Sequence, residues 1–178
     1  LKVKNHQQEV ILIEIQYERE FDFLQRVLYA SSKAIVEHLQ EGAAYHQVIK
    51  VISVNILFFN LGKGDDYIYH GTTHFKGLNT DDELQLSQKQ QQLFNKTKVA
   101  AIFPEYYLIK VNQFDDIAKT PLDEWIYFLK NEEIKDEFNA QGLQKAKQAL
   151  DVLKLSDEER QAYARHQEDL HYQASMFF

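Results

Sequence analysis

The chain has 178 residues, of which 44% are hydrophobic and 13% aromatic, enough apolar material for one folded domain and too much for a disordered segment. Its 20 Lys and Arg residues against 27 Asp and Glu residues give a formal net charge of −7, which excludes a protein that neutralises nucleic-acid phosphates over its whole surface. The lack of cysteine excludes a disulfide framework, a thiolate zinc site and a cysteine nucleophile, so any metal must bind oxygen or imidazole.

No apolar stretch of the sequence is long enough to cross a membrane. Residues 51–59 contain the polar Ser53 and Asn55 and fall far short of the roughly 20 residues that a spanning helix needs. The opening residues have neither the apolar core nor the cleavage site of a signal peptide. We therefore expect a cytoplasmic protein without a membrane partner. Because the chain begins with Leu1 rather than Met, we also expect an N-terminal truncation.

The first third of the chain changes from strand to helix and back to strand. Residues 1–4 alternate and residues 9–16, EVILIEIQ, are rich in β-branched side chains, so together they predict a hairpin. Residues 20–41 repeat apolar side chains at helical spacing up to Gly42, which predicts an amphipathic helix. Residues 48–59 are apolar at both odd and even positions, which is typical of a central strand covered on both faces.

Two further strands and then helices are predicted for the rest of the chain. The strands are expected at 67–75 and 106–111, and the glutamine-rich residues 83–96 between them fit either a short polar helix or an irregular excursion. Thr120 and Pro121 begin a helical region that we expect to include residues 122–131 and 132–154 and a last helix opening at Ser156, with Glu159 at capping-box spacing. The chain is thus expected to form an α/β core over 1–115 and a helical extension over 116–178 that packs on the core.

Glu14 and Gln16 are the most informative polar pair in the predicted strands. Because side chains alternate along a strand, they project from one face about 6.6 Å apart, while Ile13 and Ile15 point to the other face. A strand end that reaches solvent is the simpler interpretation. The other is a metal site, since a carboxylate and a backbone carbonyl beside it bind Mg²⁺ or Mn²⁺, and a polar side chain two residues on orients water or phosphate.

Several short motifs follow this pair in a fixed order. They are IEIQ at 13–16, Phe23 with Arg26, Tyr29 with Ser32 and Lys33, Gly42 with Tyr45, and VISVNILFF at 51–59. In this order they resemble the PD-(D/E)XK nuclease family transposases, the Rpn-like recombination-promoting nucleases. The later segments LDEWIYFLKN and LSDEERQAYAR resemble that family's C-terminal helices. The resemblance implies a restriction-endonuclease-like α/β core, a mixed β-sheet flanked by helices, with a C-terminal helical extension.

The resemblance also implies roles for individual residues. Glu14 matches the family's metal-binding acid, the carbonyl of Ile15 is the expected backbone ligand, and Gln16 stands where the wider superfamily usually has its catalytic lysine. The family's other metal-binding acid is an Asp on the preceding strand, and no Asp precedes Glu14 in this chain. Glu9 lies five positions before Glu14 and so faces the opposite side of a continuous strand. We expect that Asp immediately upstream of Leu1.

Arg26, Tyr29 and Lys33 form a polar face on the predicted helix. Their spacing places them within a sector of about 60° on the helix surface. Solvation of the helix is the simpler explanation for this face. The resemblance favours a role at the site for Arg26 and Tyr29, and Lys33 is a candidate beside them. We expect Arg26 to contact phosphate or support the site.

Other polar groups in the sequence do not form convincing sites. His70 and His74 would lie about 13 Å apart on a strand, too far to share one metal ion. Pro104 and Glu105 follow the Glu14 strand rather than precede it, and we expect them to open the next strand. The chain has neither a Walker phosphate loop nor a serine nucleophile elbow.

Two functions of different classes follow from these residues and the resemblance. The first is a DNA endonuclease associated with transposition or recombination that uses Mg²⁺ or Mn²⁺, with assembly into a homo-oligomer left open. The second is an inactive descendant that binds DNA or protein, which Gln16 and the missing Asp keep open. Residues 122–178 hold seven basic and twelve acidic residues, a charge of −5, which leaves −2 for the rest, so DNA affinity should be modest and salt-dependent.

Overall fold

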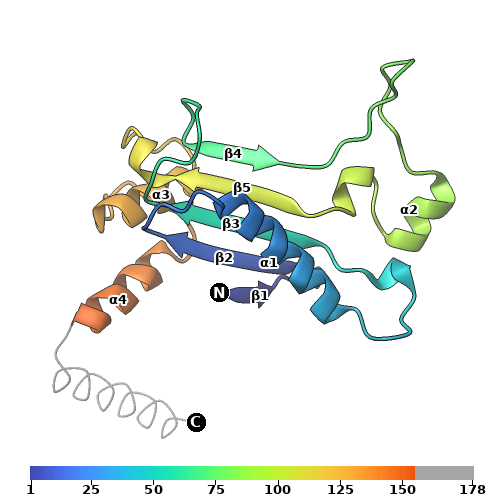
Figure 1. Ribbon diagram of the computed structural model, residues 1–178. Coiled ribbons are helices and arrows are strands. Elements are labelled where there is room, and N and C mark those ends of the chain that lie inside the picture. The colour runs from blue at the N-terminus through green and yellow to red at the C-terminus, as the bar shows by residue number, and fades with distance from the viewer. Residues whose placement is uncertain (155–178) are drawn as a thin grey trace, which may run out of the picture. The chain divides into compact units, whose positions relative to one another are not determined.

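The computed structural model describes residues 1–154 and divides the chain into two compact units, Leu1–Phe114 and Asp115–Phe178. The first unit contains a five-stranded sheet in the order β1-β2-β3-β5-β4 (Figure 1). Its strands are β1 (Lys2–Lys4), β2 (Val10–Gln16), β3 (Val51–Leu57), β4 (Ile68–Gly71) and β5 (Glu105–Lys110). The helices of the described residues are α1 (Phe23–His38), α2 (Gln88–Phe94), α3 (Pro121–Asn131) and α4 (Leu143–Lys154), with 3-10 turns at Tyr45–Gln47, Val99–Ala101 and Val111–Gln113.

The sheet is mixed, which confirms the predicted α/β class. β1 and β2 form the predicted antiparallel hairpin, and β2 runs parallel to β3 in a register that pairs Glu14 with Asn55. β3 also runs parallel to β5, and β4 is antiparallel to β5 at the edge. A parallel pair needs a crossover, and α1 supplies it between β2 and β3. The carboxyl ends of β2, β3 and β5 therefore lie at one end of the sheet.

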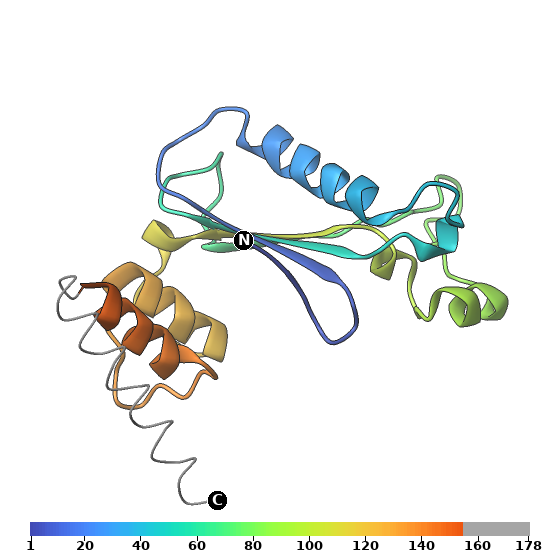
Figure 2. The ribbon, with the colours of Figure 1, turned by 90° about the horizontal axis from the view of Figure 1, so that it is seen from below.

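Helix α1 lies along one face of the sheet (Figure 2). The helix buries residues at helical spacing against the strands, and these contacts form two small hydrophobic clusters. One contains Phe23, Val27, Leu57 and Phe59, and the other contains Val10, Ala34 and Val51. The even-numbered residues of β2 therefore face α1, and this assignment places the polar end of β2 next to the start of the helix.

Several elements are shorter than the sequence predicts. Helix α1 begins after Asp22 and ends before Leu39, whose extended backbone stops the helix. β4 covers four residues, and residues 72–75 leave the sheet. In the glutamine-rich segment that fitted two interpretations, α2 is a short helix, because Ser87 and Gln90 form a capping box at its start.

The second unit begins its first helix as predicted. The side chain of Thr120 accepts a hydrogen bond from the Asp123 backbone N–H, and Asp123 accepts one in return from the Thr120 N–H, so a capping box starts α3. Ile126 and Phe128 are buried, and Tyr127 packs edge-on against Phe138 with ring centroids 5.2 Å apart. These contacts hold α3 to the segment that follows it.

The predicted helix over residues 132–154 is wrong in its first half. Glu132 adopts a left-handed backbone and ends α3, and the helix resumes only at Leu143. The side chain of Glu124 accepts the backbone N–H groups of Asn139 and Ala140, which replaces helical hydrogen bonds in this stretch. The helix predicted at Ser156 lies outside the described residues. Within residues 1–154, every helix is too short or too polar to span a membrane.

Candidate functional site

Glu14 and Gln16 lie at the carboxyl end of β2, on the face that α1 covers. In the neighbouring strand Asn55 lies beside Glu14, is only 1% exposed, and donates from Nδ2 to the Ser53 hydroxyl at 3.0 Å. These polar groups occupy positions that a purely structural sheet face would fill with apolar side chains. The end of β2 is therefore polar on the helix side as well as at its tip.

Arg26, in the first turn of α1, joins the two polar residues of β2. Its Nη2 donates to a carboxylate oxygen of Glu14 and, at 3.0 Å, to Oε1 of Gln16. Its Cζ lies 5.0 Å from the centroid of the Phe23 ring, a cation–π contact that helps hold the guanidinium. The structure thus brings together Glu14, Gln16 and Arg26, three residues that the sequence singles out.

Glu20 completes this group, and sequence analysis missed it. Arg26 Nη1 lies 2.6 Å from each carboxylate oxygen of Glu20, and Gln16 Nε2 donates to Oε1 of Glu20 at 3.0 Å. Glu18, Glu20 and Asp22 alternate as acids between β2 and α1, and nothing in the sequence distinguishes Glu20 among them. We call Glu14, Gln16, Glu20 and Arg26 the Arg26 cluster.

A cavity of about 470 Å³ lies beside the Arg26 cluster. Glu14, Ile15, Ser53 and Asn55 line it, together with Leu1 at the start of the hairpin. Ile13 exchanges both backbone hydrogen bonds with Leu1, so strand alternation turns the carbonyl of Ile15 toward the same edge of β2. A carboxylate and a backbone carbonyl thus lie next to a space that a small ligand can enter.

The hairpin register bears on the second acid that the resemblance implies. β1 pairs with β2 so that Lys2 lies opposite Leu12, and Leu1 lies opposite Ile13. Within residues 1–154, no acidic side chain lies opposite Glu14 across the hairpin. The second acid that the resemblance implies therefore stays a prediction.

Tyr29 and Lys33 are not joined to the Arg26 cluster. Tyr29 is 68% exposed, and the ammonium of Lys33 lies 3.8 Å from Glu37, one turn further along α1. Seven residues separate Lys33 from Arg26, which is about 10 Å along the helix axis. Of the three residues predicted to share a helix face, Arg26 thus lies at the site, whereas Tyr29 and Lys33 face solvent.

A second polar group lies at the opposite end of the sheet, at the amino ends of β3 and β5. The carboxylate of Glu105 lies 3.1 Å from Lys50 Nζ and 2.8 Å from His70 Nε2, and it accepts a hydrogen bond from the Tyr107 hydroxyl at 2.7 Å. We call these four residues the Glu105 network. Burial acts to raise the pKa of Glu105, but these hydrogen bonds outweigh it and lower that pKa to about 2. The hydrogen bond between Tyr107 and Glu105, together with burial, raises the pKa of Tyr107 to about 12.

The remaining candidate positions have separate partners. His74 bonds Glu83 and the Thr72 hydroxyl, each at 2.8 Å, so it does not share a partner with His70. Glu105 is the first residue of β5, which confirms that Pro104 and Glu105 open a strand. Within residues 1–154, no three His, Cys, Asp or Glu side chains gather in an arrangement that could hold a metal ion.

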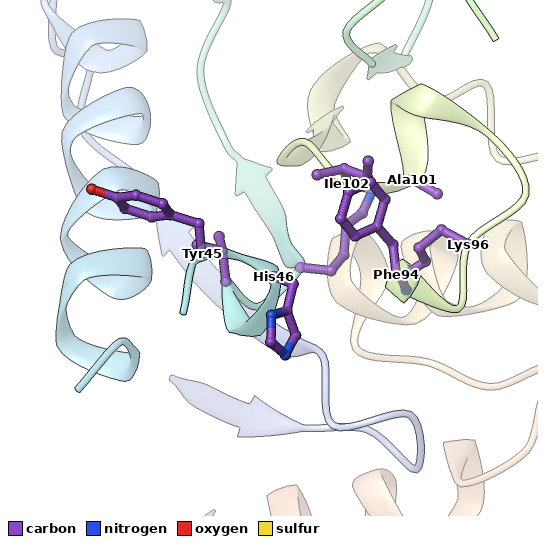
Figure 3. A pocket seen from close by; sticks show the side chains of 8 residues that line it. Tyr45, His46, Phe94, Lys96, Ala101 and Ile102 are labelled. Atoms are coloured by element: carbon purple, nitrogen blue, oxygen red, sulfur yellow. The ribbon is translucent and has the colours of Figure 1, made fainter. Parts of the chain in front are cut away.

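A smaller pocket of about 210 Å³ contains none of the residues that the sequence predicts for a site (Figure 3). Phe94 and Ile102 both line it, while the Tyr45 ring points away toward α1. The pocket is mainly apolar, and its two lysines, Lys50 and Lys96, are paired with acids. Its chemistry gives no reason to place the functional site there.

Comparison with known proteins agrees with the resemblance drawn from the motifs. The family model for PD-(D/E)XK nuclease family transposases matches residues 1–176. No curated protein and no solved structure gives a match. The mixed sheet with α1 on one face is the restriction-endonuclease-like α/β core expected of this family. The chain therefore belongs to the PD-(D/E)XK nuclease family transposases.

Proposed function

We propose that this chain is a divalent-metal-dependent DNA endonuclease, associated with transposition or recombination, that hydrolyses phosphodiester bonds. The observation that carries the proposal is the Arg26 cluster at the carboxyl end of β2, where Glu14 and Gln16 share one guanidinium beside a cavity. Family membership supports the nuclease class and DNA as the substrate.

The donor atoms at this site fit a hard cation such as Mg²⁺ or Mn²⁺, which prefers oxygen ligands. Glu14 and the carbonyl of Ile15 would hold the ion. When bound, a divalent ion neutralises phosphate charge and makes a coordinated water more acidic.

The side chains of the cluster supply the remaining functions. Arg26 donates to the scissile phosphate and carries the positive charge that Gln16, in the lysine position, does not bring. Gln16 orients the attacking water. Tyr29 and Lys33, exposed further along α1, contact DNA beside the cleavage point rather than the reacting atoms. One helix thus serves both the chemistry and the binding of the substrate.

Cleavage of supercoiled plasmid by the full-length natural protein tests the proposal. Wild type should nick the plasmid with Mg²⁺ or Mn²⁺ and not with EDTA, and Glu14→Ala should lower the rate at least about 100-fold by removing a metal ligand. Glu41→Ala, which removes an exposed acid after α1, is the matched control and should cleave like wild type. Equal cleavage by Glu14→Ala and Glu41→Ala would contradict the proposal.

A second candidate function is a nuclease-fold module that binds DNA or protein without catalysis. It is favoured by Gln16, which brings no positive charge, and by the Arg26 ion pair, which already neutralises Glu14. The same assay separates the two candidates. A folded wild-type protein that retards DNA in a gel but cuts it with neither metal would establish the module.

A further inference from the structure

We propose that Glu20 is a positioning residue for the hydrolysis, which fixes the amide of Gln16 so that its oxygen accepts a hydrogen bond from the attacking water. This proposal rests on the proposed nuclease function. Glu20 lies between β2 and α1, three residues before the helix begins, and its side chain is about one third exposed. Glu20 is not among the residues that line the cavity, and its hydrogen bonds go to Gln16 and Arg26, so its effect passes through these two partners.

The hydrogen bonds around Gln16 decide which way its amide points. Nε2 donates to Glu20 at 3.0 Å and to the backbone carbonyl of Glu18 at 3.2 Å, while Oε1 accepts from Arg26 at 3.0 Å. The flipped amide would place its oxygen against two acceptors and its N–H₂ group against the guanidinium. Glu20 therefore helps to exclude that orientation, and the amide oxygen is the atom of Gln16 that faces Arg26.

This orientation matters because an oxygen and an amino group do different chemistry at the position of the superfamily lysine. An amide oxygen can accept a hydrogen bond from a water molecule, whereas Nε2, bonded to Glu20 and Glu18, has no free N–H to donate. Gln16 thus acts on the water, and the positive charge at the phosphate comes from Arg26. A glutamine in the lysine position is then compatible with catalysis, provided that its amide is held in this orientation.

Glu20 also binds one terminal nitrogen of the guanidinium, while Glu14 binds the other. Arg26 Nη1 lies 2.6 Å from both oxygen atoms of Glu20, while Nη2 reaches Glu14 and Gln16. When Glu14 binds a cation, the contacts with Glu20 keep Arg26 at the site with Nη2 available for a phosphate oxygen. A single carboxylate therefore positions both the residue that orients water and the residue that binds phosphate.

The test compares Glu20→Gln with Asp22→Asn in the full-length protein. Asp22 is an exposed acid two residues away whose side chain does not cap the helix, so it controls for the loss of one negative charge in the same loop. Glu20→Gln should lower kcat for plasmid cleavage by roughly 10- to 100-fold, since misplaced groups lose rate on this scale, and change KM for DNA less than about threefold. Glu20→Asp should recover part of the rate.

Two further measurements separate positioning from the other roles of an acid. Glu20→Gln should keep the Mn²⁺ affinity of wild type, because Glu14 is intact; a loss as large as in Glu14→Ala would make Glu20 a metal ligand and overturn the proposal. In the Arg26→Ala background, Glu20→Gln should lower the cleavage rate by a smaller factor than it does alone, because Gln16 has already lost its hydrogen bond with Arg26. Circular dichroism should show an unchanged fold.

A readout that does not need activity keeps the two proposals apart. The side-chain amide protons of Gln16, assigned in a ¹H–¹⁵N spectrum by their loss in Gln16→Ala, should shift in Glu20→Gln and stay in place in Asp22→Asn. If wild type cleaves and Glu20→Gln matches Asp22→Asn in rate and in amide shifts, the role of Glu20 is wrong while the nuclease stands. If wild type does not cleave, the nuclease fails, and unmoved amide protons would overturn the Glu20–Gln16 contact as well.

Discussion

The two ends of the central sheet carry two ionic groups of opposite character. At the amino ends of β3 and β5, Lys50 is almost completely buried and its partner Glu105 is largely buried. At the carboxyl end of β2, Glu14, Glu20 and Arg26 are each about one third exposed and lie beside an open cavity. In the first group one carboxylate, Glu105, is shared by Lys50, His70 and Tyr107. In the second group one guanidinium is shared by two carboxylates and an amide.

This difference separates stability from function. The Glu105 network links β4 and β5 to Lys50, which directly precedes β3. Its hydrogen bonds hold the pKa of Glu105 far below its ordinary value, so they stabilise the folded state when Glu105 is ionised. In the Arg26 cluster a single guanidinium serves two carboxylates and an amide. Ion pairs of a cation that is about one third exposed contribute little to stability.

Arg26→Ala should give the largest effect on cleavage and leave stability almost unchanged. We expect plasmid cleavage to fall roughly 100- to 1000-fold, the usual cost of removing one donor that stabilises transition-state charge. The free energy of unfolding, measured by urea denaturation, should change by less than about 1 kcal/mol, because ion pairs whose side chains are about one third exposed contribute little. Arg26→Lys should recover part of the rate, since it restores the charge without the two-pronged geometry.

Loss of cleavage in Arg26→Ala accompanied by a large loss of stability would break the comparison between the two ends. The Arg26 cluster would then be structural, and the protein would need the guanidinium beside Glu14 and Glu20 in order to fold. Arg19→Ala is the matched control, because Arg19 is an exposed arginine in the loop that precedes α1, and its guanidinium lies over the Phe21 ring.

The Glu105 network should show its effect in the pH dependence of stability. The pKa of Glu105 is about 2 in the folded protein against an ordinary 4.5, so its stabilisation is complete above about pH 4.5 and is lost as the pH falls toward 2. We expect a loss of about 1–2 kcal/mol over this range, which takes account of the partial exposure of the group. Urea denaturation at several pH values measures it.

Glu105→Gln should flatten this part of the pH profile, since it removes the titrating carboxylate. Glu83→Gln is a suitable control, because Glu83 also pairs with a histidine, His74, but both side chains are exposed. If Glu105→Gln kept the acid sensitivity of wild type, the network would not be a source of stability, and the contrast between the ends of the sheet would be lost.

The sequence predicts the strands and helices best where one periodicity covers many residues. The hairpin, α1, β3 and β5 all have such a pattern, and their order and type are confirmed. The helix prediction for the stretch after Glu132 was wrong because its composition suits a helix, while hydrogen bonds to the Glu124 side chain favour another backbone path. Contacts between residues far apart in sequence override local preference there, and no pattern within the segment reports them.

The candidate site was predictable only in part, for a similar reason. Alternation along one strand was enough to place Glu14 and Gln16 on one face, and helical spacing indicated Arg26. The spacing also grouped Lys33 with Arg26, but a shared helix face does not mean a shared partner when two turns separate the residues. Glu20 lies in an irregular segment, where no period relates a residue to its neighbours in space, so its role needs coordinates.

Lys33 should give the smallest effect, and it tests how far the functional surface extends from the Arg26 cluster. Its side chain is 59% exposed and only loosely paired with Glu37, so it can reach a phosphate without losing a strong contact. Lys33→Ala should raise the DNA concentration for half-maximal cleavage about two- to threefold at low salt, with kcat unchanged and the difference lost at high salt. Lys89→Ala, which removes an exposed lysine on α2, is the control. A kcat effect in Lys33→Ala would instead place Lys33 at the reacting phosphate, which would require α1 to shift along the sheet when DNA binds.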